Sequence, residues 1–419
     1  MANFAPPPGT ADIFEPEAAT WRWLENAAAE VFSAYGYGEL RTPIFEYTEV
    51  FQRGLGGETE VVQKEMYTFE DRGGRSLTLR PEGTAGVMRA LANTDVMNGV
   101  EQRVYYHGPM FRGERPAAGR RRQFHQIGVE NVGRCAPLID AECIAMLAAF
   151  LRKIGLEDFQ LEINTRGIAS DRVPAEKLLS DYFSSRIDAM CDDCKTRLHR
   201  NLWRILDCKQ EKCRQIINSA PEYRRSFSPE SQAYFQQLCD ALTALKIPYR
   251  VNPLLVRGLD YYVHTVFEVT HPGLGAQTAI AGGGRYELYL PGEKRPLPGV
   301  GFAAGVERLL LARESKQLSA ISADAISVYL IGLNESARIA NLQFADRLRG
   351  AGIKAALELE ERSFKAQMRS ANRAQAKFAL LRGESEMEKQ IVILKNMADG
   401  SQQELSESDC FNFLTQNGK

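Results

Sequence analysis

The chain lacks the features that are typical of secreted, membrane-spanning and strongly basic proteins. Its 52 basic side chains nearly balance 53 acidic ones, so the formal net charge is −1. This balance excludes a histone-like polycation but permits nucleic-acid binding through local basic patches. The longest apolar run, residues 143–151, is about half as long as a membrane-spanning helix requires. The first residues, MANFAPPPGT, contain no basic segment followed by an apolar one, so we expect no secretory signal and no membrane partner.

Internal repeats and low-complexity tracts are also absent from the sequence. The 419 residues are 44% hydrophobic and 25% charged, as in ordinary globular proteins, and this length predicts two or three folding units. Eight cysteines in a chain without a secretory signal indicate the reducing cytoplasm, with the cysteines either as free thiols or in a metal site.

The pattern of expected helices and strands divides the chain into parts. Residues 1–320 combine mostly antiparallel strands with interspersed helices, which predicts an α+β domain. Within it, residues from about 170 to 250 are mainly helical and contain cysteines, so we interpret them as an insertion. The polar residues 314–324 predict a linker, and residues 325–419 alternate strands with helices, as a small separate α/β domain does.

Arginines are concentrated in residues 111–130, between two expected strands. Pro116 and Gly119 indicate a loop there. The arginines of this segment are Arg112, Arg115, Arg120, Arg121 and Arg122. Guanidinium groups at this density repel one another unless an anion lies among them, and their donors fit phosphate and carboxylate oxygens. The expected ligand is therefore a nucleotide polyphosphate, a nucleic-acid backbone or both, with a solvated basic loop as the alternative.

Further segments place polar or glycine-rich sequences at the ends of expected strands. They are LRPEGT at residues 79–84, LVRGLDYY at 255–262, AGGGRY at 281–286 and GVGFAAGVER at 299–308. Together with the arginine loop, these segments resemble the three signature motifs of class II aminoacyl-tRNA synthetases. LVRGLDYY and AGGGRY resemble histidyl-tRNA synthetases in particular. The similarity runs from Thr42 into the carboxy-terminal domain, where VILKNM at residues 392–397 also fits.

This resemblance implies a two-step ligation of L-histidine to tRNA(His). ATP and histidine would form histidyl-adenylate, and the acyl group would then pass to the terminal ribose of the tRNA. Histidine carries an ionised carboxylate at neutral pH, so the nucleophile needs alignment rather than a base. The resemblance also implies a class II catalytic domain, an anticodon-binding carboxy-terminal domain, Mg²⁺ with the pyrophosphate, and a homodimer with the strand at residues 41–45 at its interface.

The resemblance further implies a role for individual side chains. Arg112 and Arg257 would contact the histidine carboxylate and the α-phosphate, as the catalytic pair. The implied ATP contacts are Arg112, Glu114, Arg120, Phe124 and Arg308, with Phe124 and Arg308 on either side of the adenine. The implied histidine contacts are Glu82, Thr84 and Gln126 around the α-ammonium and Glu130, Tyr261 and Tyr262 around the imidazole. No side chain of this site is assigned as a metal ligand.

Each of these residues also has a purely structural interpretation. Glu82 could cap the helix that follows it. Tyr261 and Tyr262 could be core aromatics, and alternation along a strand predicts that only one of them faces a pocket. Phe124 alone would more often belong to a core. The glycines at 282–284 could admit a flat ligand against bare backbone, or form a bulge. Their joint occurrence favours the active-site interpretation.

Four cysteines lie close together in the insertion. Cys191 and Cys194 are separated by two residues, and Cys208 and Cys213 by four, which is acceptable for tetrahedral zinc. The unclustered Cys143 and Cys239, and insertions of the resembled family that lack some of these cysteines, instead favour free thiols. Structural zinc at this cluster therefore remains the second interpretation.

Two non-catalytic alternatives compete with a ligase. Synthetase-like proteins can act as histidine-sensing regulatory subunits of histidine biosynthesis, without the carboxy-terminal domain and with altered active-site residues. Here Arg112, Arg257, Glu130 and Arg308 are all present, and so is the terminal domain, which favours the ligase. A tRNA-sensing binding module is the other alternative, and it would not need an intact ATP site.

Overall fold

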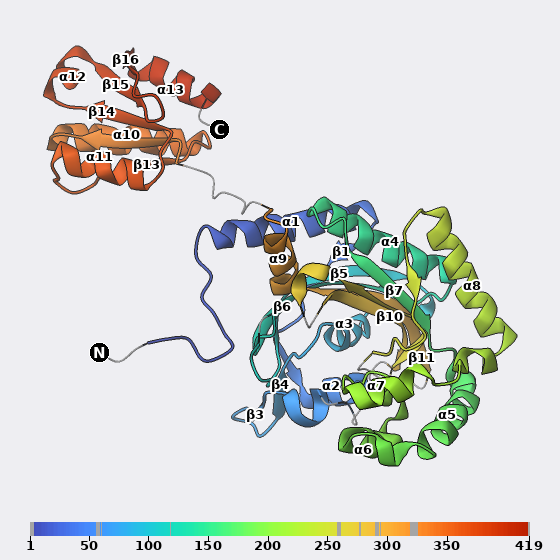
Figure 1. Ribbon diagram of the computed structural model, residues 1–419. Coiled ribbons are helices and arrows are strands. Elements are labelled where there is room, and N and C mark those ends of the chain that lie inside the picture. Colours follow the sequence, from blue (N-terminus) through green and yellow to red (C-terminus); the bar gives the residue numbers. More distant parts are fainter. Residues whose placement is uncertain are drawn as a thin grey trace. The chain divides into compact units, whose positions relative to one another are not determined.

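The computed structural model describes residues 4–55, 59, 61–117, 119–257, 261–275, 278–289, 293, 295–318 and 326–417, with only the backbone of Leu55. The chain forms two compact units, Met1–Ala320 and Ile321–Lys419 (Figure 1). The expected linker overlaps the end of helix α9 (Val306–Ser315), and residues 319–325 lie outside the described residues. Within the described part of the chain, no helix has both the length and the hydropathy needed to span a bilayer.

The first unit is built on an eight-stranded sheet, which confirms the mostly antiparallel α+β prediction. In spatial order its strands are β1 (Gly38–Glu39), β5 (Gln102–Phe111), β6 (Gln123–Val132), β11 (Pro296–Gly305), β10 (Ala279–Tyr289), β9 (Tyr262–Thr270), β7 (Gln160–Thr165) and β8 (Arg250–Val251). Only the outer pairs β1–β5 and β7–β8 are parallel. The arginine-rich segment is the connection between the antiparallel neighbours β5 and β6.

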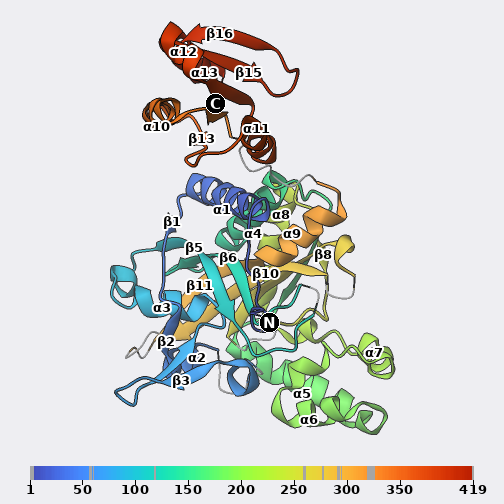
Figure 2. The same cartoon turned by 90° about the vertical axis from the view of Figure 1, so that its left-hand side faces the viewer.

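Helices cover one face of this sheet (Figure 2). They are α1 (Glu17–Ala34), α4 (Pro137–Lys153), α8 (Pro229–Ala244) and α9. Their apolar side chains, such as Phe32 and Phe150, pack with Phe302 of the sheet in the main core. Arg285 of the AGGGRY segment is completely buried and pairs with Asp140 of α4 over 2.6 Å. A buried charge needs such a partner, so this arginine joins the sheet to the helix layer.

The opposite face carries a second apolar cluster and the smaller elements. Helix α3 (Thr84–Leu91) packs there against Tyr106, Met110 and Tyr286. A three-stranded sheet is formed by β2 (Phe45–Tyr47), β4 (Ser76–Leu79) and β3 (Thr68–Glu70), next to α2 (Thr48–Leu55). Residues 41–44, expected to be part of a strand, precede β2 without joining it, since Pro43 cannot donate to a ladder.

The insertion has a core of its own. It is made by α5 (Ala169–Ser184), α6 (Asp192–Arg200), α7 (Glu211–Asn218) and the short helices η3 (Ile187–Ala189), η4 (Leu202–Ile205) and η5 (Tyr223–Ser226). This core ends at about Phe227, whereas Leu238 and Leu242 of α8 belong to the main core. The separate core is therefore shorter than the helical range expected from the sequence. The remaining short helices of the first unit are η1 (Val61–Glu65), η2 (Asp95–Asn98) and η6 (Pro272–Leu274).

The second unit is an α/β domain. Its sheet has the order β13 (Ala355–Leu357), β12 (Val328–Gly332), β14 (Phe378–Arg382), β15 (Ile391–Asn396) and β16 (Gln402–Ser406). The first two pairs are parallel and the last two are antiparallel. Its helices are α10 (Glu335–Gly350), α11 (Phe364–Arg373), α12 (Glu384–Lys389) and α13 (Glu407–Asn417). Apolar cores lie on both faces of the sheet, as expected for buried parallel strands.

Candidate active site

Strand β6 presents alternate residues to the two faces of the large sheet. Ile127 and Val129 point into the main core with the helix layer. Because side chains alternate along a strand, Phe124, Gln126 and Glu130 point to the opposite face, where α3 lies. Three side chains that the sequence predicted to contact ATP or histidine therefore line one face of a single strand.

Glu130 is the buried centre of this face. Its side chain is 2% exposed, and its carboxylate accepts hydrogen bonds from the Thr84 hydroxyl and the Tyr286 hydroxyl, each over 2.7 Å. Burial raises the pKa of Glu130 to about 8, further helped by the charge of Glu82, while the two hydrogen bonds lower it. A ligand that donates a hydrogen bond or carries positive charge would stabilise the ionised form of Glu130 here.

Glycines of β11 create the space for these two side chains. A Cβ atom at Gly301 would lie 2.2 Å from Glu130 Oε2, and one at Gly299 would lie 2.4 Å from the Tyr286 ring. Neither contact is possible between non-bonded atoms without displacement of the side chain. The glycine spacing in GVGFAAG thus places a carboxylate and a phenol against bare backbone.

The glycine run of β10 works in the same way. A Cβ atom at Gly282 would lie 2.5 Å from an Arg257 guanidinium nitrogen, and one at Gly284 would lie 2.9 Å from the Tyr262 ring. Bare backbone therefore accommodates the protein's own side chains at these positions. Gly282, Gly283 and Gly284 pair in regular register with Glu268, Phe267 and Val266. The register shift follows Gly284, where β9 contributes the two extra residues His264 and Thr265, so the irregularity is not in the glycine run.

Glu82 and Thr84 connect the start of α3 to Glu130. The Glu82 carboxylate accepts the backbone N–H groups of Thr84 and Ala85 over 2.9 and 2.7 Å, so it caps this helix as its structural interpretation predicted. Thr84 in turn donates its hydroxyl hydrogen bond to Glu130. Burial raises the pKa of Glu82, while these hydrogen bonds and the charge of Arg112 lower it. A carboxylate has about four acceptor positions, so capping leaves Glu82 able to accept from a ligand.

Gln126 carries an open acceptor in the site. Its Oε1 atom is buried and has no hydrogen-bond partner among the described residues. An unsatisfied buried acceptor costs about 1–3 kcal/mol, so a donor from a bound ligand would be stabilising here.

Tyr261 and Tyr262 both lie in the same aromatic group. Their ring centroids are 4.7 Å apart, and Tyr261 makes an edge contact with the Tyr286 ring at 5.7 Å. Burial raises the pKa of both phenols, and the charges of Glu82 and Glu130 raise it further. Alternation does not separate the two rings, because Tyr261 lies in the turn before β9 begins. Residues 258–260 of the same motif lie outside the described residues.

Of the two arginines predicted to be catalytic, Arg112 directly follows β5, and Arg257 lies in the connection between β8 and β9. Arg112 Nε donates to the Pro81 carbonyl over 2.9 Å, and its guanidinium carbon lies 5.4 Å from the Phe124 ring centroid. Arg257 pairs with Glu268 over 2.7 Å. Glu268 lies on β9 and was not identified from the sequence, because the β9–β10 pairing brings it to this position.

Further charged side chains surround the loop between β5 and β6. Arg308 of α9 donates to the Gly119 carbonyl over 3.0 Å and to the Ala279 carbonyl over 2.7 Å. Arg120 pairs with Glu114 over 2.8 Å. Burial lowers the pKa of Arg308, and so do the positive charges of Arg120 and Arg112, while Glu114 opposes them. Three guanidinium groups thus repel one another across a common space, which an anionic ligand would relieve.

Comparison with known proteins identifies the family. The family model for histidyl-tRNA synthetases matches residues 9–309, and a model for anticodon-binding domains matches residues 327–417. The chain belongs to the histidyl-tRNA synthetase family. The resemblance inferred from the motifs is therefore confirmed.

Related proteins cover this synthetase-family chain almost completely. The histidine–tRNA ligase of Halothermothrix orenii is 46% identical over 95% of this chain and 96% of its own. Histidine–tRNA ligase 1 of Shouchella clausii is 45% identical over 97% of each chain. The apo crystal structure of S. aureus histidyl-tRNA synthetase has a TM-score of 0.82 at 35% identity, covering 98% of this chain and 99% of the other. Both units are shared with these histidyl-tRNA synthetases.

Tyr286 is a candidate site residue that sequence reasoning did not assign. It ends the AGGGRY motif, which was the available signal, but its role depends on its hydrogen bond to Glu130. Strand β11 lies between β10 and β6, with Tyr286 opposite Gly299 and Gly301 opposite Glu130. Only this register brings the phenol across a glycine strand to the carboxylate.

Proposed function

We propose that the protein ligates L-histidine to tRNA(His), using ATP and a histidyl-adenylate intermediate. The observation that carries this proposal is Glu130, a buried carboxylate held by Thr84 and Tyr286 in a chain of this family. An imidazole N–H is the kind of donor that such a carboxylate would bind. A substrate side chain without this donor would leave Glu130 without a hydrogen bond from the ligand, and sites of this kind reject such analogues by roughly 10⁴–10⁵.

The α-ammonium of histidine is recognised by the acceptors at the start of α3 and on β6. Gln126 Oε1 supports this role, because it is buried without a partner among the described residues. Glu82 supplies a negative charge that acts on Glu130, and Thr84 connects these two carboxylates through its backbone N–H and its hydroxyl. Tyr261 and Tyr262 then enclose the imidazole with their rings.

The ATP phosphates occupy the space among Arg112, Arg120 and Arg308. The mutual repulsion of these guanidinium groups supports an anionic ligand between them. Phe124 and Arg308 enclose the adenine, since a flat ring and a planar guanidinium both stack on a base. Mg²⁺ would partly neutralise the pyrophosphate, and Glu114 is the carboxylate of this loop whose oxygen donors suit such an ion.

The first chemical step is attack of the histidine carboxylate on the α-phosphorus, with departure of pyrophosphate. Arg112 and Arg257 bind the carboxylate and the α-phosphate, hold them in alignment, and stabilise the negative charge that develops on the equatorial oxygens. Arg257 would exchange its contact with Glu268 for the nucleotide oxygens in this step. In the second step a ribose hydroxyl of the tRNA attacks the acyl carbon, and AMP leaves.

The carboxy-terminal unit binds the anticodon region of the tRNA. On α11, Lys365, Arg369 and Arg373 are exposed at intervals of one helical turn and form a basic face. Arg362 precedes this helix and lies near Glu358 and Glu360. It is therefore a weaker candidate for a phosphate contact.

The protein acts as a homodimer in the cytoplasm. A homodimer is supported by exposed apolar side chains on the small sheet and the segments beside it, namely Ile44, Phe45, Tyr47, Tyr67 and Phe69. Groups of this kind mark interaction surfaces more often than isolated apolar residues do. None of the eight cysteines, all within the described residues, is in a disulfide, as is usual in a reducing compartment.

Histidine-dependent exchange of pyrophosphate into ATP tests the proposed function. The ligase requires exchange with histidine and transfer of histidine to tRNA(His). A histidine-sensing regulatory subunit would bind histidine without exchange, and a tRNA-binding module would bind tRNA without either activity. Absence of exchange from folded, histidine-binding protein would contradict the proposal.

A further inference from the structure

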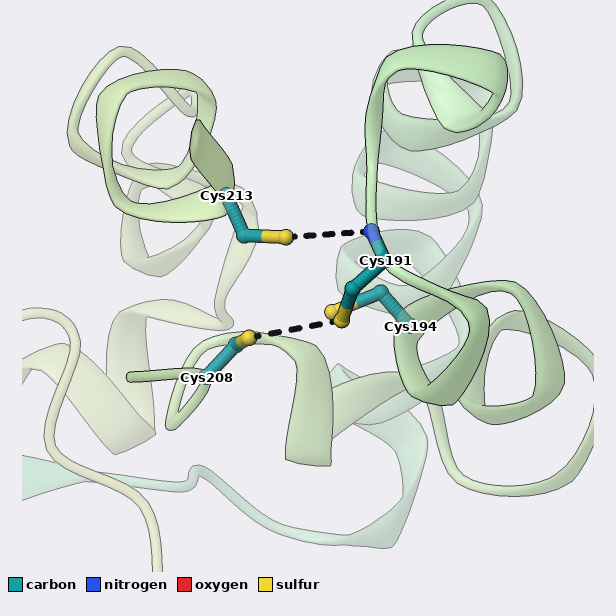
Figure 3. Close-up of side chains that lie close together, drawn as sticks. All are labelled: Cys191, Cys194, Cys208 and Cys213. Carbon is teal, nitrogen blue, oxygen red and sulfur yellow. Dashed lines mark hydrogen bonds between the residues drawn. The ribbon is translucent and has the colours of Figure 1, made fainter. Parts of the chain in front are cut away.

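Four cysteine side chains converge in the separate core of the insertion. Cys194, Cys208 and Cys213 are buried and Cys191 is partly buried. All four Sγ atoms lie within 4.8 Å of one another, and those of Cys191 and Cys208 are 3.8 Å apart (Figure 3). Among the described residues, no other group of cysteine, histidine or acidic side chains has such an arrangement.

These distances match a tetrahedral thiolate site. With zinc–sulfur bonds of about 2.3 Å, sulfurs at the corners of a tetrahedron lie about 3.8 Å apart. The Cys191–Cys208 separation has this value, and the remaining separations require only small adjustments of side chains. A disulfide would need sulfurs about 2.05 Å apart, and none of these cysteines is in one.

We propose that Cys191, Cys194, Cys208 and Cys213 bind one Zn²⁺ ion as a structural site in the insertion. Four thiolates fill a tetrahedral coordination sphere and leave no position for water, so the ion would have no catalytic role. His199, a spare ligand in this part of the sequence, is exposed and lies outside the group. The sequence alone favoured free thiols, and the convergence of all four sulfurs is the observation that changes this preference.

The location of the cysteines explains what the ion would do. Cys191 directly precedes α6 and Cys194 lies in its first turn, while Cys208 lies between η4 and α7 and Cys213 lies within α7. The backbone N–H of Cys191 also donates to Cys213 Sγ over 3.2 Å, so α6 and α7 already meet at this point. Zinc would link these two helices and the segment between them. Such a link stabilises a core that is too small to bury much apolar surface. Zinc binds the cysteines as thiolates, so the protons of those that are still thiols are released to solvent on binding.

Metal analysis of the full-length protein, purified without a metal-affinity step, tests this site. We expect about one zinc ion per chain, and after chelation and Co²⁺ addition, the visible absorption of tetrahedral cobalt–thiolate coordination. Purified protein without zinc that also gives no cobalt–thiolate absorption would overturn the proposal. A disulfide between Cys191 and Cys208 in freshly purified protein would overturn it as well.

Single substitutions locate the ion. Cys208→Ser and Cys213→Ser should lose most of the zinc, whereas Cys239→Ser, which changes a buried cysteine of α8 outside the group, should retain it. Unchanged zinc content in both cluster variants would overturn the assignment. If these variants are insoluble, the cobalt titration of the unmodified chain decides the question. The outcome is independent of the proposed function, because pyrophosphate exchange can be present or absent in either case.

Discussion

The Tyr286 hydroxyl donates a hydrogen bond to Glu130 Oε2 over 2.7 Å, and both residues are only 2% exposed. The two residues come from strands that do not pair with each other, since β11 lies between them. The contact is possible because β11 has glycines between the two side chains, Gly299 beside the phenol and Gly301 beside the carboxylate. This contact sets the position of the group that we propose to read the imidazole.

Tyr286→Phe should therefore raise the KM for histidine in pyrophosphate exchange. Loss of a hydrogen bond to a charged group costs about 1.5–3 kcal/mol, which corresponds to roughly ten-fold or more in KM. The KM for ATP should change much less. Tyr182→Phe removes a comparable hydroxyl contact, to the Ile216 carbonyl in the insertion, and should leave both constants unchanged. Equal histidine kinetics in Tyr286→Phe and the unmodified protein would refute the role of this contact.

Gly301→Ala should disable the site through a steric effect. The added Cβ would lie 2.2 Å from Glu130 Oε2 and 2.3 Å from the Val129 carbonyl oxygen, so the carboxylate or the strand must move. We expect loss of histidine-dependent exchange together with a lower melting temperature. The control is Gly350→Ala at the end of α10, where a Cβ would meet nothing within 4 Å. It should retain full activity, and a fully active Gly301→Ala variant would show that Glu130 is not confined as described.

The stability of the ligand-free protein should depend on the protonation of Glu130. Burial raises the pKa of this carboxyl from 4.5 to about 8 in the folded state, against the hydrogen bonds that lower it. Between these values the folded protein holds a proton that the unfolded chain has released, so stability falls as pH rises through this window.

Glu130→Gln removes this dependence while keeping a hydrogen-bonding side chain of similar size. The melting temperature of the variant should therefore rise relative to that of the unmodified protein as pH increases from about 5 to 8. Over this range the free energy of unfolding of the unmodified protein should fall by at most about 1.4 kcal/mol per pH unit relative to that of the variant. Thermal unfolding followed across this range is the measurement. If the melting temperatures of the two proteins differed by the same amount at every pH, Glu130 would titrate in its ordinary range.

Arg257→Ala should nearly abolish adenylate formation while leaving tRNA binding intact. The guanidinium group is proposed to act on the reacting phosphate, and loss of one such group typically costs about 10²–10³ in rate. Pyrophosphate exchange and a tRNA-binding assay measure the two properties. Glu268→Gln, which removes only the partner of Arg257 in the unliganded site, should have a smaller effect on exchange. Normal exchange in Arg257→Ala would refute the catalytic assignment.

Phe45→Glu should weaken self-association of the protein. Phe45 is 46% exposed and its ring lies 6.4 Å from that of Phe69, so a charge would interrupt the exposed apolar group of the small sheet. Sedimentation velocity should show a larger monomer fraction at a given concentration. Leu359→Glu places the same charge at a residue of the second unit that is 63% exposed, and it should not alter association. A monomeric unmodified protein would contradict the proposed dimer.

Much of the architecture follows from local patterns in the chain. The apolar face of α1 is read from its helical spacing, with Trp21, Leu24 and Phe32 all buried. The alternation of polar and apolar residues in β6, and the presence of Pro116 and Gly119 in the arginine loop, likewise predict two strands with a loop between them. Strand β16 was not anticipated, because its sequence, QQELS, is polar and almost entirely exposed, so it has no apolar alternation to detect.

Patterns of residues therefore determined the family, most of the order of helices and strands, and most of the side chains proposed to bind histidine and ATP. Tertiary structure alone decided how these side chains are partnered. Glu130 meets Tyr286 across β11, Arg257 meets Glu268, and four cysteines from separate short elements converge. The physical reason is that hydrogen-bond and ion-pair partners depend on strand register and helix packing. Those are set by burial over the whole domain, and no local stretch of sequence contains them.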